Sequence, residues 1–153
     1  VTTNPVISPQ KPAPKRSAAG KTVLKTGKGR VLVMDDEAVI GDIARRILSR
    51  AGYTVSVELE GAAAVATYRA ALDAGKRFDA VILDMTVPGG MGGMEAAAEM
   101  LVLDPKVGII LSSGYSKDDP GYSALAAGRV SFLAKPYTME QLTSMVAKAI
   151  RSR

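Results

Sequence analysis

The chain lacks several residue types, and each absence excludes a class of chemistry. Its 153 residues contain no cysteine, no histidine and no tryptophan. Without cysteine, neither disulfide bonds nor thiolate chemistry is available, which is compatible with the reducing cytoplasm where we expect this protein. Without histidine, there is no Ser-His-Asp or Cys-His catalytic arrangement, no histidine ligand for zinc and no phosphohistidine intermediate within these residues.

Long hydrophobic runs are also missing, and the positive charge is concentrated at one end. No apolar run approaches the ~20 residues that a membrane span requires, and no signal peptide pattern is visible. The formal net charge is +5, but residues 1–29 hold six lysines and arginines and no acid. The remaining chain has acids slightly in excess, so we expect no direct contact with nucleic acid or with a membrane in this segment.

The first 28 residues differ in composition from the rest of the chain. They are rich in Pro, Lys, Ser, Thr and Ala, which predicts a disordered basic linker or tail over residues 1–28. Four prolines interrupt regular structure there: Pro5, Pro9, Pro12 and Pro14. The length of the chain suits one domain, which we expect over residues 29–153.

Short apolar strands alternate with amphipathic helices after the linker. Strands are predicted at Val31–Met34, Thr54–Leu59, Ala80–Leu83, Val107–Leu111 and Val130–Ala134. Helices are predicted at about 37–51, 61–74, 93–103, 118–127 and 138–151, the fourth being weak because a Pro-Gly pair disturbs its start. This alternation predicts an α/β fold with a parallel five-stranded sheet and helices on both faces. Functional sites in such sheets lie beyond the carboxyl ends of the strands.

Three carboxylates stand where predicted strands end. Asp35 and Asp36 follow Val31–Met34, and Asp84 follows Ala80–Leu83. Two unit charges about 4 Å apart repel by roughly 4 kcal/mol at an effective dielectric constant near 20. A cluster of this kind therefore binds a cation, takes up a proton or takes part in chemistry. Carboxylate oxygens suit Mg²⁺, with Asp36 and Asp84 as ligands and Asp35 orienting coordinated water, and no soft ligand favours zinc or copper.

Each candidate residue also has an ordinary structural interpretation. A single aspartate after a strand is more often a helix N-cap or a turn residue, but three at matching strand ends favour a site. Lys135 would ordinarily be a solvated loop lysine, whereas facing three acids it is a candidate counter-ion for a phosphoryl group. Ser112 and Ser113, after the fourth strand, can form a turn, and a hydroxyl there can donate to a phosphoryl oxygen. Composition alone favours core packing for Phe132.

Two further motifs carry less information. The sequence raises the possibility of a cis peptide bond between Lys135 and Pro136, an isomer that only about 5–6% of X–Pro bonds adopt. The glycine-rich stretch Gly89–Gly93 lacks the Lys-Ser/Thr of a phosphate-binding P-loop and does not match G-x-G-x-x-G. We interpret this stretch as flexible backbone.

Taken in order, these motifs resemble the receiver domain of two-component response regulators. The resemblance covers about residues 29–150 and rests on five segments: Val33–Glu37, Val81–Pro88, Leu111–Gly114, Phe132 and Lys135–Pro136. It implies a doubly wound, flavodoxin-like (CheY-like) fold with strand order 2-1-3-4-5. It also implies a place in a phosphorelay, in which the domain assists its own phosphorylation and dephosphorylation.

The resemblance assigns an acceptor and a metal site. Asp84 would accept a phosphoryl group from a phosphohistidine on a partner, either a histidine kinase or a histidine phosphotransfer domain. Mg²⁺, or Mn²⁺ in its place, would be held by Asp35, Asp36, Asp84 and the backbone carbonyl of Thr86. A metal and an ammonium would together neutralise the charge of an in-line transfer.

The resemblance also assigns a switch. Lys135 and Ser113 would contact the phosphoryl oxygens, and Ser113 and Phe132 would then reorient and change partner binding at the face of the fourth and fifth strands. The segment Gly27–Arg30 and the residues around Ser113-Gly114 look like receivers attached to hybrid sensor histidine kinases. We therefore expect the C-terminal receiver of such a kinase, as a monomer or a weak dimer.

Two other functions fit the acid cluster less well. A Mg²⁺-dependent phosphatase with an aspartyl nucleophile generally has a second acid two residues after it, where this chain has Thr86. A pseudo-receiver, which binds partners without taking up phosphate, would not require the complete acid set together with Lys135.

Overall fold

The structure is a computed structural model, and it describes residues 27–114 and 130–152. Residues 1–26 of the predicted linker and the helix predicted at about 118–127 lie outside the described residues. None of the helices in the described ranges has both the length and the apolar character of a membrane span.

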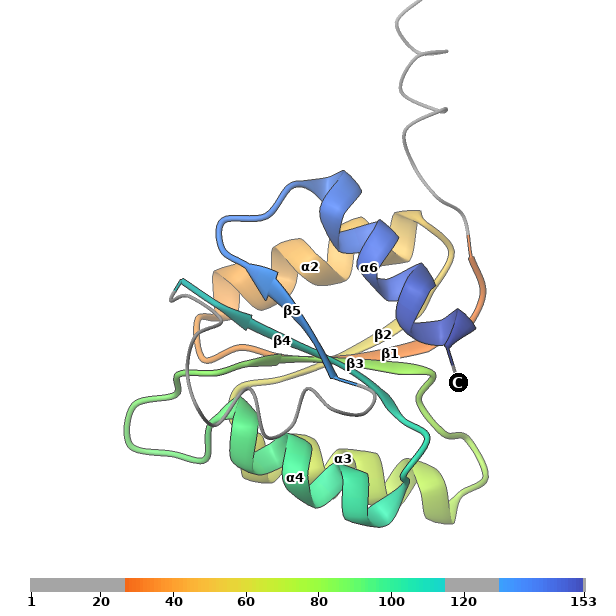
Figure 1. Ribbon diagram of the computed structural model, residues 1–153, viewed down its shortest axis with the longest axis vertical. Coiled ribbons are helices and arrows are strands. Elements are labelled where there is room, and N and C mark those ends of the chain that lie inside the picture. Colours follow the sequence, from red (N-terminus) through yellow and green to blue (C-terminus); the bar gives the residue numbers. More distant parts are fainter. Residues whose placement is uncertain (1–26, 115–129, 153) are drawn as a thin grey trace, which may run out of the picture.

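Five parallel strands form one sheet in the order β2-β1-β3-β4-β5 (Figure 1). The strands are β1 (Arg30–Met34), β2 (Thr54–Glu58), β3 (Ala80–Asp84), β4 (Gly108–Ser113) and β5 (Val130–Ala134). The chain runs from β1 outward to β2 and then crosses to β3 on the other side of β1, so the strand order reverses between β1 and β3. The predicted fold and strand order are confirmed, and the reversal creates a crevice at the carboxyl ends of these two strands.

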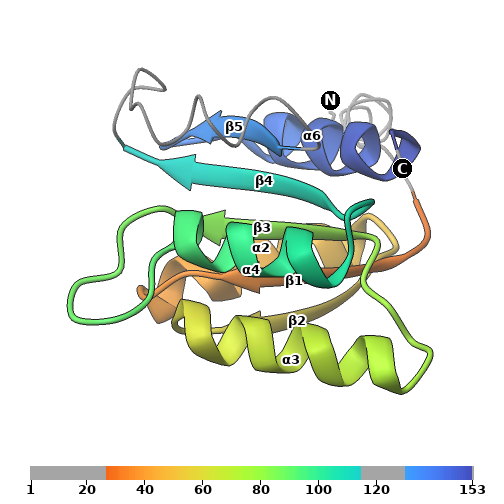
Figure 2. The ribbon, with the colours of Figure 1, turned by 60° about the horizontal axis from the view of Figure 1, so that its bottom comes forward.

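Among the described residues, two helices cover each face of the sheet. Figure 1 shows α2 (Ala38–Arg50) and α6 (Met139–Arg151) above the sheet, and α3 (Gly61–Asp73) and α4 (Gly93–Leu103) below it. Figure 2 shows the same sheet from another angle, with α3 and α4 in front. We call these two sides the α2/α6 face and the α3/α4 face.

The two faces carry separate apolar cores because side chains alternate along each strand. On β1, Val31 and Val33 pack on the α2/α6 face, whereas Leu32 and Met34 pack on the α3/α4 face. All residues of β3 and β4 are buried, as their continuous apolar character predicts for the centre of a parallel sheet. Position along a strand therefore decides on which face a side chain lies, and this also applies to the polar residues at the strand ends.

The predicted end of the fourth strand at Leu111 is wrong. β4 extends two residues further, through Ser113. Ser112 pairs in register with Asp84 on β3, and the backbone carbonyl of Ser113 accepts the N–H of Lys135 at 2.9 Å. A central strand has hydrogen-bonding neighbours on both sides, and these outweigh the preference of serine for turns.

A capping box sets the start of α6, and its first residue, Thr138, lies three residues after Lys135. The Thr138 hydroxyl oxygen accepts the backbone N–H of Gln141 at 3.0 Å, and the Gln141 side-chain oxygen accepts the N–H of Thr138 at 2.8 Å. Two amide groups that the first turn leaves without helical partners are thereby satisfied. The segment from β5 to α6, which carries Lys135, is held at both ends.

Candidate functional site

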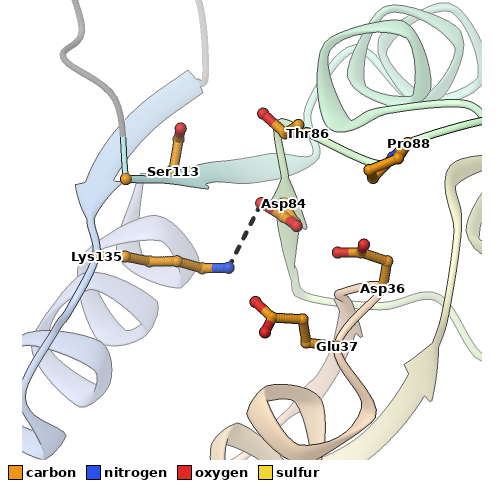
Figure 3. A pocket seen from close by; sticks show the side chains of 8 residues that line it. Asp36, Glu37, Asp84, Thr86, Pro88, Ser113 and Lys135 are labelled. Atoms are coloured by element: carbon orange, nitrogen blue, oxygen red, sulfur yellow. Dashed lines mark ion pairs between the residues drawn. The ribbon is translucent and has the colours of Figure 1, made fainter.

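Three carboxylates and one ammonium converge at the carboxyl end of the sheet. Figure 3 shows two of these carboxylates, Asp36 and Asp84, together with Lys135. Asp84 is the last residue of β3, Asp35 and Asp36 follow β1, and Lys135 follows β5. One carboxylate oxygen from each aspartate lies within 4.8 Å of the others. The structure thus brings together the four charged residues that the sequence placed at separate strand ends.

Lys135 reaches two of the three carboxylates. Its Nζ lies 2.7 Å from Oδ2 of Asp35 and 3.5 Å from Oδ1 of Asp84. Burial alone would lower the pKa of the Lys135 ammonium, but its contacts with these two acids outweigh burial and raise the pKa above its ordinary value. The lysine is therefore a fixed positive charge inside the cluster.

The carboxyl group of Asp84 has a strongly raised pKa. Its side chain is buried, and burial raises the pKa of the Asp84 carboxyl to about 6. The Lys135 ammonium and the Thr86 backbone N–H oppose this change, whereas the nearby Asp36 and Asp35 carboxylates add to it. Asp84 therefore carries a carboxylate that is more basic than usual and lacks sufficient counter-charge.

The other two acids differ in exposure. Asp35 is buried, and its Oδ1 accepts the backbone N–H of Glu37 at 2.9 Å while its Oδ2 accepts from Lys135. Asp36 is exposed, and Figure 3 shows its side chain extending into the pocket beside Asp84. Three carboxylates with one ammonium between them leave an excess of negative charge and several free oxygen lone pairs. This donor set fits a hard divalent cation such as Mg²⁺ or Mn²⁺.

A pocket of about 350 Å³ opens over Asp84. Its lining consists of Asp36, Glu37, Asp84, Thr86, Pro88, Ser113, Gly114 and Lys135. Three of these lining residues were not predicted as site residues from the sequence: Glu37, Pro88 and Gly114. Each lies in one of the segments that carried the resemblance, and that position is the signal that would have identified it.

The two predicted switch residues lie on the opposite face from the lysine. Phe132 pairs in register with Leu111, which packs on the α3/α4 face, and Ser113 follows Leu111 by two residues. Figure 3 shows the Ser113 hydroxyl pointing away from the Lys135 ammonium. Phe132 is half-buried, not fully enclosed as core packing would require.

The peptide bond between Lys135 and Pro136 is cis, the isomer that the sequence had raised as a possibility.

The family follows from a comparison with known protein families. The family model of the response regulator receiver domain matches residues 31–147 of the chain. The chain belongs to this family. The resemblance found in the sequence is thereby confirmed, and the crevice described above lies within this receiver domain.

Curated relatives differ in how much of their length the receiver domain spans. This chain is 31% identical over 128 residues to the transcriptional regulatory protein FixJ of Bradyrhizobium diazoefficiens, a match that covers 82% of this chain and 58% of FixJ. It is 31% identical over 120 residues to the chemotaxis protein CheY of Thermotoga maritima, a match that covers 78% of this chain and 95% of CheY. The chain therefore spans little more than half of the first relative and nearly all of the second.

Solved structures share the architecture. A response regulator receiver domain protein from Clostridium thermocellum superimposes with a TM-score of 0.69 at 26% identity, covering 80% of this chain and 94% of that one. The response regulator TrrA of Thermotoga maritima, solved in complex with Mg²⁺ and BeF, gives a TM-score of 0.66 at 27% identity, covering 78% and 97%.

Proposed function

We propose that Asp84 accepts a phosphoryl group from a phosphohistidine on a partner histidine kinase or histidine phosphotransfer domain. The observation that carries this proposal is the environment of Asp84: a buried carboxylate of raised pKa at the base of a pocket, beside one lysine and two further acids. The phosphodonor lies outside these 153 residues, because they contain no histidine.

The transfer requires little covalent chemistry from the domain. One carboxylate oxygen of Asp84 attacks phosphorus in line with the bond to the histidine ring nitrogen. The new O–P bond forms as the P–N bond breaks, and the ring nitrogen leaves with the electron pair and takes a proton from solvent. Lys135, already 3.5 Å from Asp84, neutralises charge on the phosphoryl oxygens.

We propose that the acids hold Mg²⁺ through Asp35, Asp36, Asp84 and the backbone carbonyl of Thr86. A bound Mg²⁺ supplies electrostatic neutralisation of the transferring group. The excess of acid over ammonium at the site supports this assignment. Further support comes from the Mg²⁺ and BeF complex of the related TrrA.

The regulatory output follows from the added charge. A phosphoryl group brings about −1.5 to −2 charges to a pocket that already has excess acid. Lys135 and the Ser113 hydroxyl contact its oxygens, and Ser113 and Phe132 then reorient on the α3/α4 face of β4 and β5. Because both residues lie on that face, their movement changes the surface that a partner binds. The origin in a hybrid histidine kinase, the cytoplasmic location and the monomeric or weakly dimeric state stay predictions.

Intact-protein mass after incubation with Mg²⁺ and acetyl phosphate tests the proposal. The wild type should gain one phosphoryl group, and Asp84→Asn should gain none, because the amide is not a nucleophile. Asp42→Asn, which removes a partly exposed acid of α2 outside the pocket, is the matched control and should behave as the wild type. Equal uptake by Asp84→Asn would contradict the assignment of Asp84.

If neither wild type nor control gains mass, beryllofluoride binding in the presence of Mg²⁺ separates the two remaining explanations. A receiver that accepts only its own protein donor binds beryllofluoride. A pseudo-receiver, which acts by partner binding alone, does not.

A further inference from the structure

A buried hydroxyl group lies next to the site and has no part in the function proposed above. Ser112 is 2% exposed, and its Oγ has no hydrogen-bond partner within the described part of the chain. Buried polar side-chain atoms nearly always have a partner, so this one requires an explanation. Its place in β4, directly beside Asp84 in register, connects it to the site.

The alternation of side chains places Ser112 on the same face as the charged cluster. Ile110, two residues earlier, and Leu133, its partner in register on β5, both pack on the α2/α6 face. Asp84 lies two positions after Ile82 on β3, and Lys135, just beyond β5, lies two positions after Leu133. Both Ile82 and Leu133 belong to that same core. The Ser112 hydroxyl therefore faces the side of the sheet on which Lys135 meets Asp84.

The side chain of Lys135 spans the width of β4. β4 lies between β5 and β3, so the Lys135 side chain crosses β4 to come within 3.5 Å of Asp84. Ser112 is the last β4 position on this face, and Gly114 follows the strand two residues later, where an added Cβ would meet nothing within 4 Å. Gly114 leaves open space at this end of β4, and Ser112 is the buried polar residue of β4 on this face.

We propose that Ser112 is a positioning residue for Lys135, an inference that rests on the proposed phosphoacceptor function. In the structure the ammonium donates to Asp35 at 2.7 Å. When Asp84 carries a phosphoryl group, the ammonium turns from Asp35 toward the phosphoryl oxygens, and the Ser112 Oγ accepts one of its three N–H groups. The hydroxyl thus has its partner in the phosphorylated state and holds the ammonium over Asp84.

Removing the hydroxyl should have opposite effects on stability and on phosphoryl binding. Ser112→Ala should raise the melting temperature of the unphosphorylated protein, because a buried hydroxyl without a partner disappears. The same change should weaken beryllofluoride binding and slow phosphoryl uptake about tenfold, the loss expected for one hydrogen bond to a charged group. The affinity for Mg²⁺ alone should not change. Ser131→Ala, an equal change two strand positions before Leu133 on the same face, is the control and should alter neither.

A double-mutant cycle with Lys135→Ala tests the mechanism. If Ser112 acts through the lysine, Ser112→Ala should have no further effect on phosphoryl uptake in the Lys135→Ala background. The same tenfold loss in both backgrounds, or no loss in the wild-type background, would overturn the inference while leaving Asp84 as acceptor. A wild type that neither takes up phosphate nor binds beryllofluoride would overturn the proposed function, and this inference with it.

Discussion

Two buried aspartates at opposite ends of the sheet have opposite electrostatic surroundings. Asp84 ends β3 at the carboxyl edge, and Asp104 precedes β4 at the amino edge; they are 6% and 9% exposed. Burial raises the pKa of Asp84 to about 6. Burial acts in the same direction on Asp104, but its hydrogen-bond donors outweigh burial and lower the pKa of that carboxyl below its ordinary value.

The difference lies in the number of donors for each acid. Asp104 accepts from the Tyr68 hydroxyl at 2.7 Å, from the Lys106 backbone N–H at 3.1 Å and from the Arg77 guanidinium. At the other edge, Asp84 shares a single ammonium with Asp35 and has Asp36 beside it. A buried acid with a complete set of donors stabilises the fold, whereas one that lacks them is available for binding and chemistry.

Removing Asp104 should produce the largest loss of stability. Asp104→Ala leaves the Tyr68 hydroxyl and the Arg77 guanidinium without their shared partner, and we expect the free energy of unfolding to fall by about 3 kcal/mol. Urea unfolding measures this change. Tyr68→Phe removes one donor only and should cost about 1 kcal/mol. Phosphoryl uptake by the folded fraction should persist, and its loss would show that the two edges are not independent.

Removing Asp84 should have the opposite effect on stability. Because the folded-state pKa is raised from 3.8 to about 6, the folded protein holds this proton more tightly than the unfolded chain does. The associated stability is fully present below about pH 4 and is lost as the pH rises through about 6. One pKa unit corresponds to about 1.4 kcal/mol, so Asp84→Asn without metal should gain about 3 kcal/mol at pH 7.5.

The pH dependence of that gain is the informative measurement. Urea unfolding of wild type and Asp84→Asn, in the presence of a chelator, should converge near pH 4 and separate between pH 4 and pH 7. A constant difference over this range would show that the asparagine acts through packing and not through the charge. For Asp104, whose pKa is lowered, the stability contribution should be present at neutral pH and lost as the pH falls.

Mg²⁺ should stabilise the charged cluster by a smaller amount that depends on concentration. A ligand that binds only the folded state at ten times its dissociation constant adds about 1.4 kcal/mol. Thermal unfolding at pH 7.5 should therefore show a higher midpoint with Mg²⁺ for the wild type. Asp36→Asn should lose this gain, because it removes the exposed carboxylate of the cluster. An undiminished gain in that variant would place the metal elsewhere.

The smallest effect is expected at Asp42, a partly exposed aspartate on α2. Its hydrogen bond from Arg45, together with the nearby Arg46, outweighs the opposing effect of burial and lowers the pKa of its carboxyl. Surface ion pairs of this kind contribute little because water screens them. Asp42→Asn should leave the thermal midpoint within experimental error. A clear shift of the midpoint would mean that removing any single carboxylate charge changes stability. Burial would then not explain the contrast between Asp84 and Asp104.

The sequence allowed much of the sheet and its acid cluster to be predicted. Apolar runs located the five strands within two residues, and parallel strands bring their carboxyl ends to one edge, so Asp35, Asp36, Asp84 and Lys135 were expected together. It did not show that β4 continues through Ser112 and Ser113, because local preference for a turn conflicts there with pairing to both neighbouring strands.

The network around Asp104 had no local signal. Tyr68 and Arg77 lie 36 and 27 residues from Asp104 in the chain, and the sequence predicted only that a helix ends just before this aspartate. Likewise, only the packed sheet shows that Lys135 donates to Asp35 in this state while lying farther from Asp84. Which acid is satisfied and which is not depends on contacts between distant segments.

By itself, the sequence determined the alternation of strands and helices, the strand ends at which charges stand, and the absence of any histidine donor. These follow from local periodicity and composition, which act over a few residues. The tertiary structure alone decided the opposite pKa changes of Asp84 and Asp104, the partner of the lysine, and the lack of a hydrogen-bond partner for the Ser112 hydroxyl among the described residues. Those properties depend on burial and on donors from other strands, and both arise only when the sheet and its helices pack together.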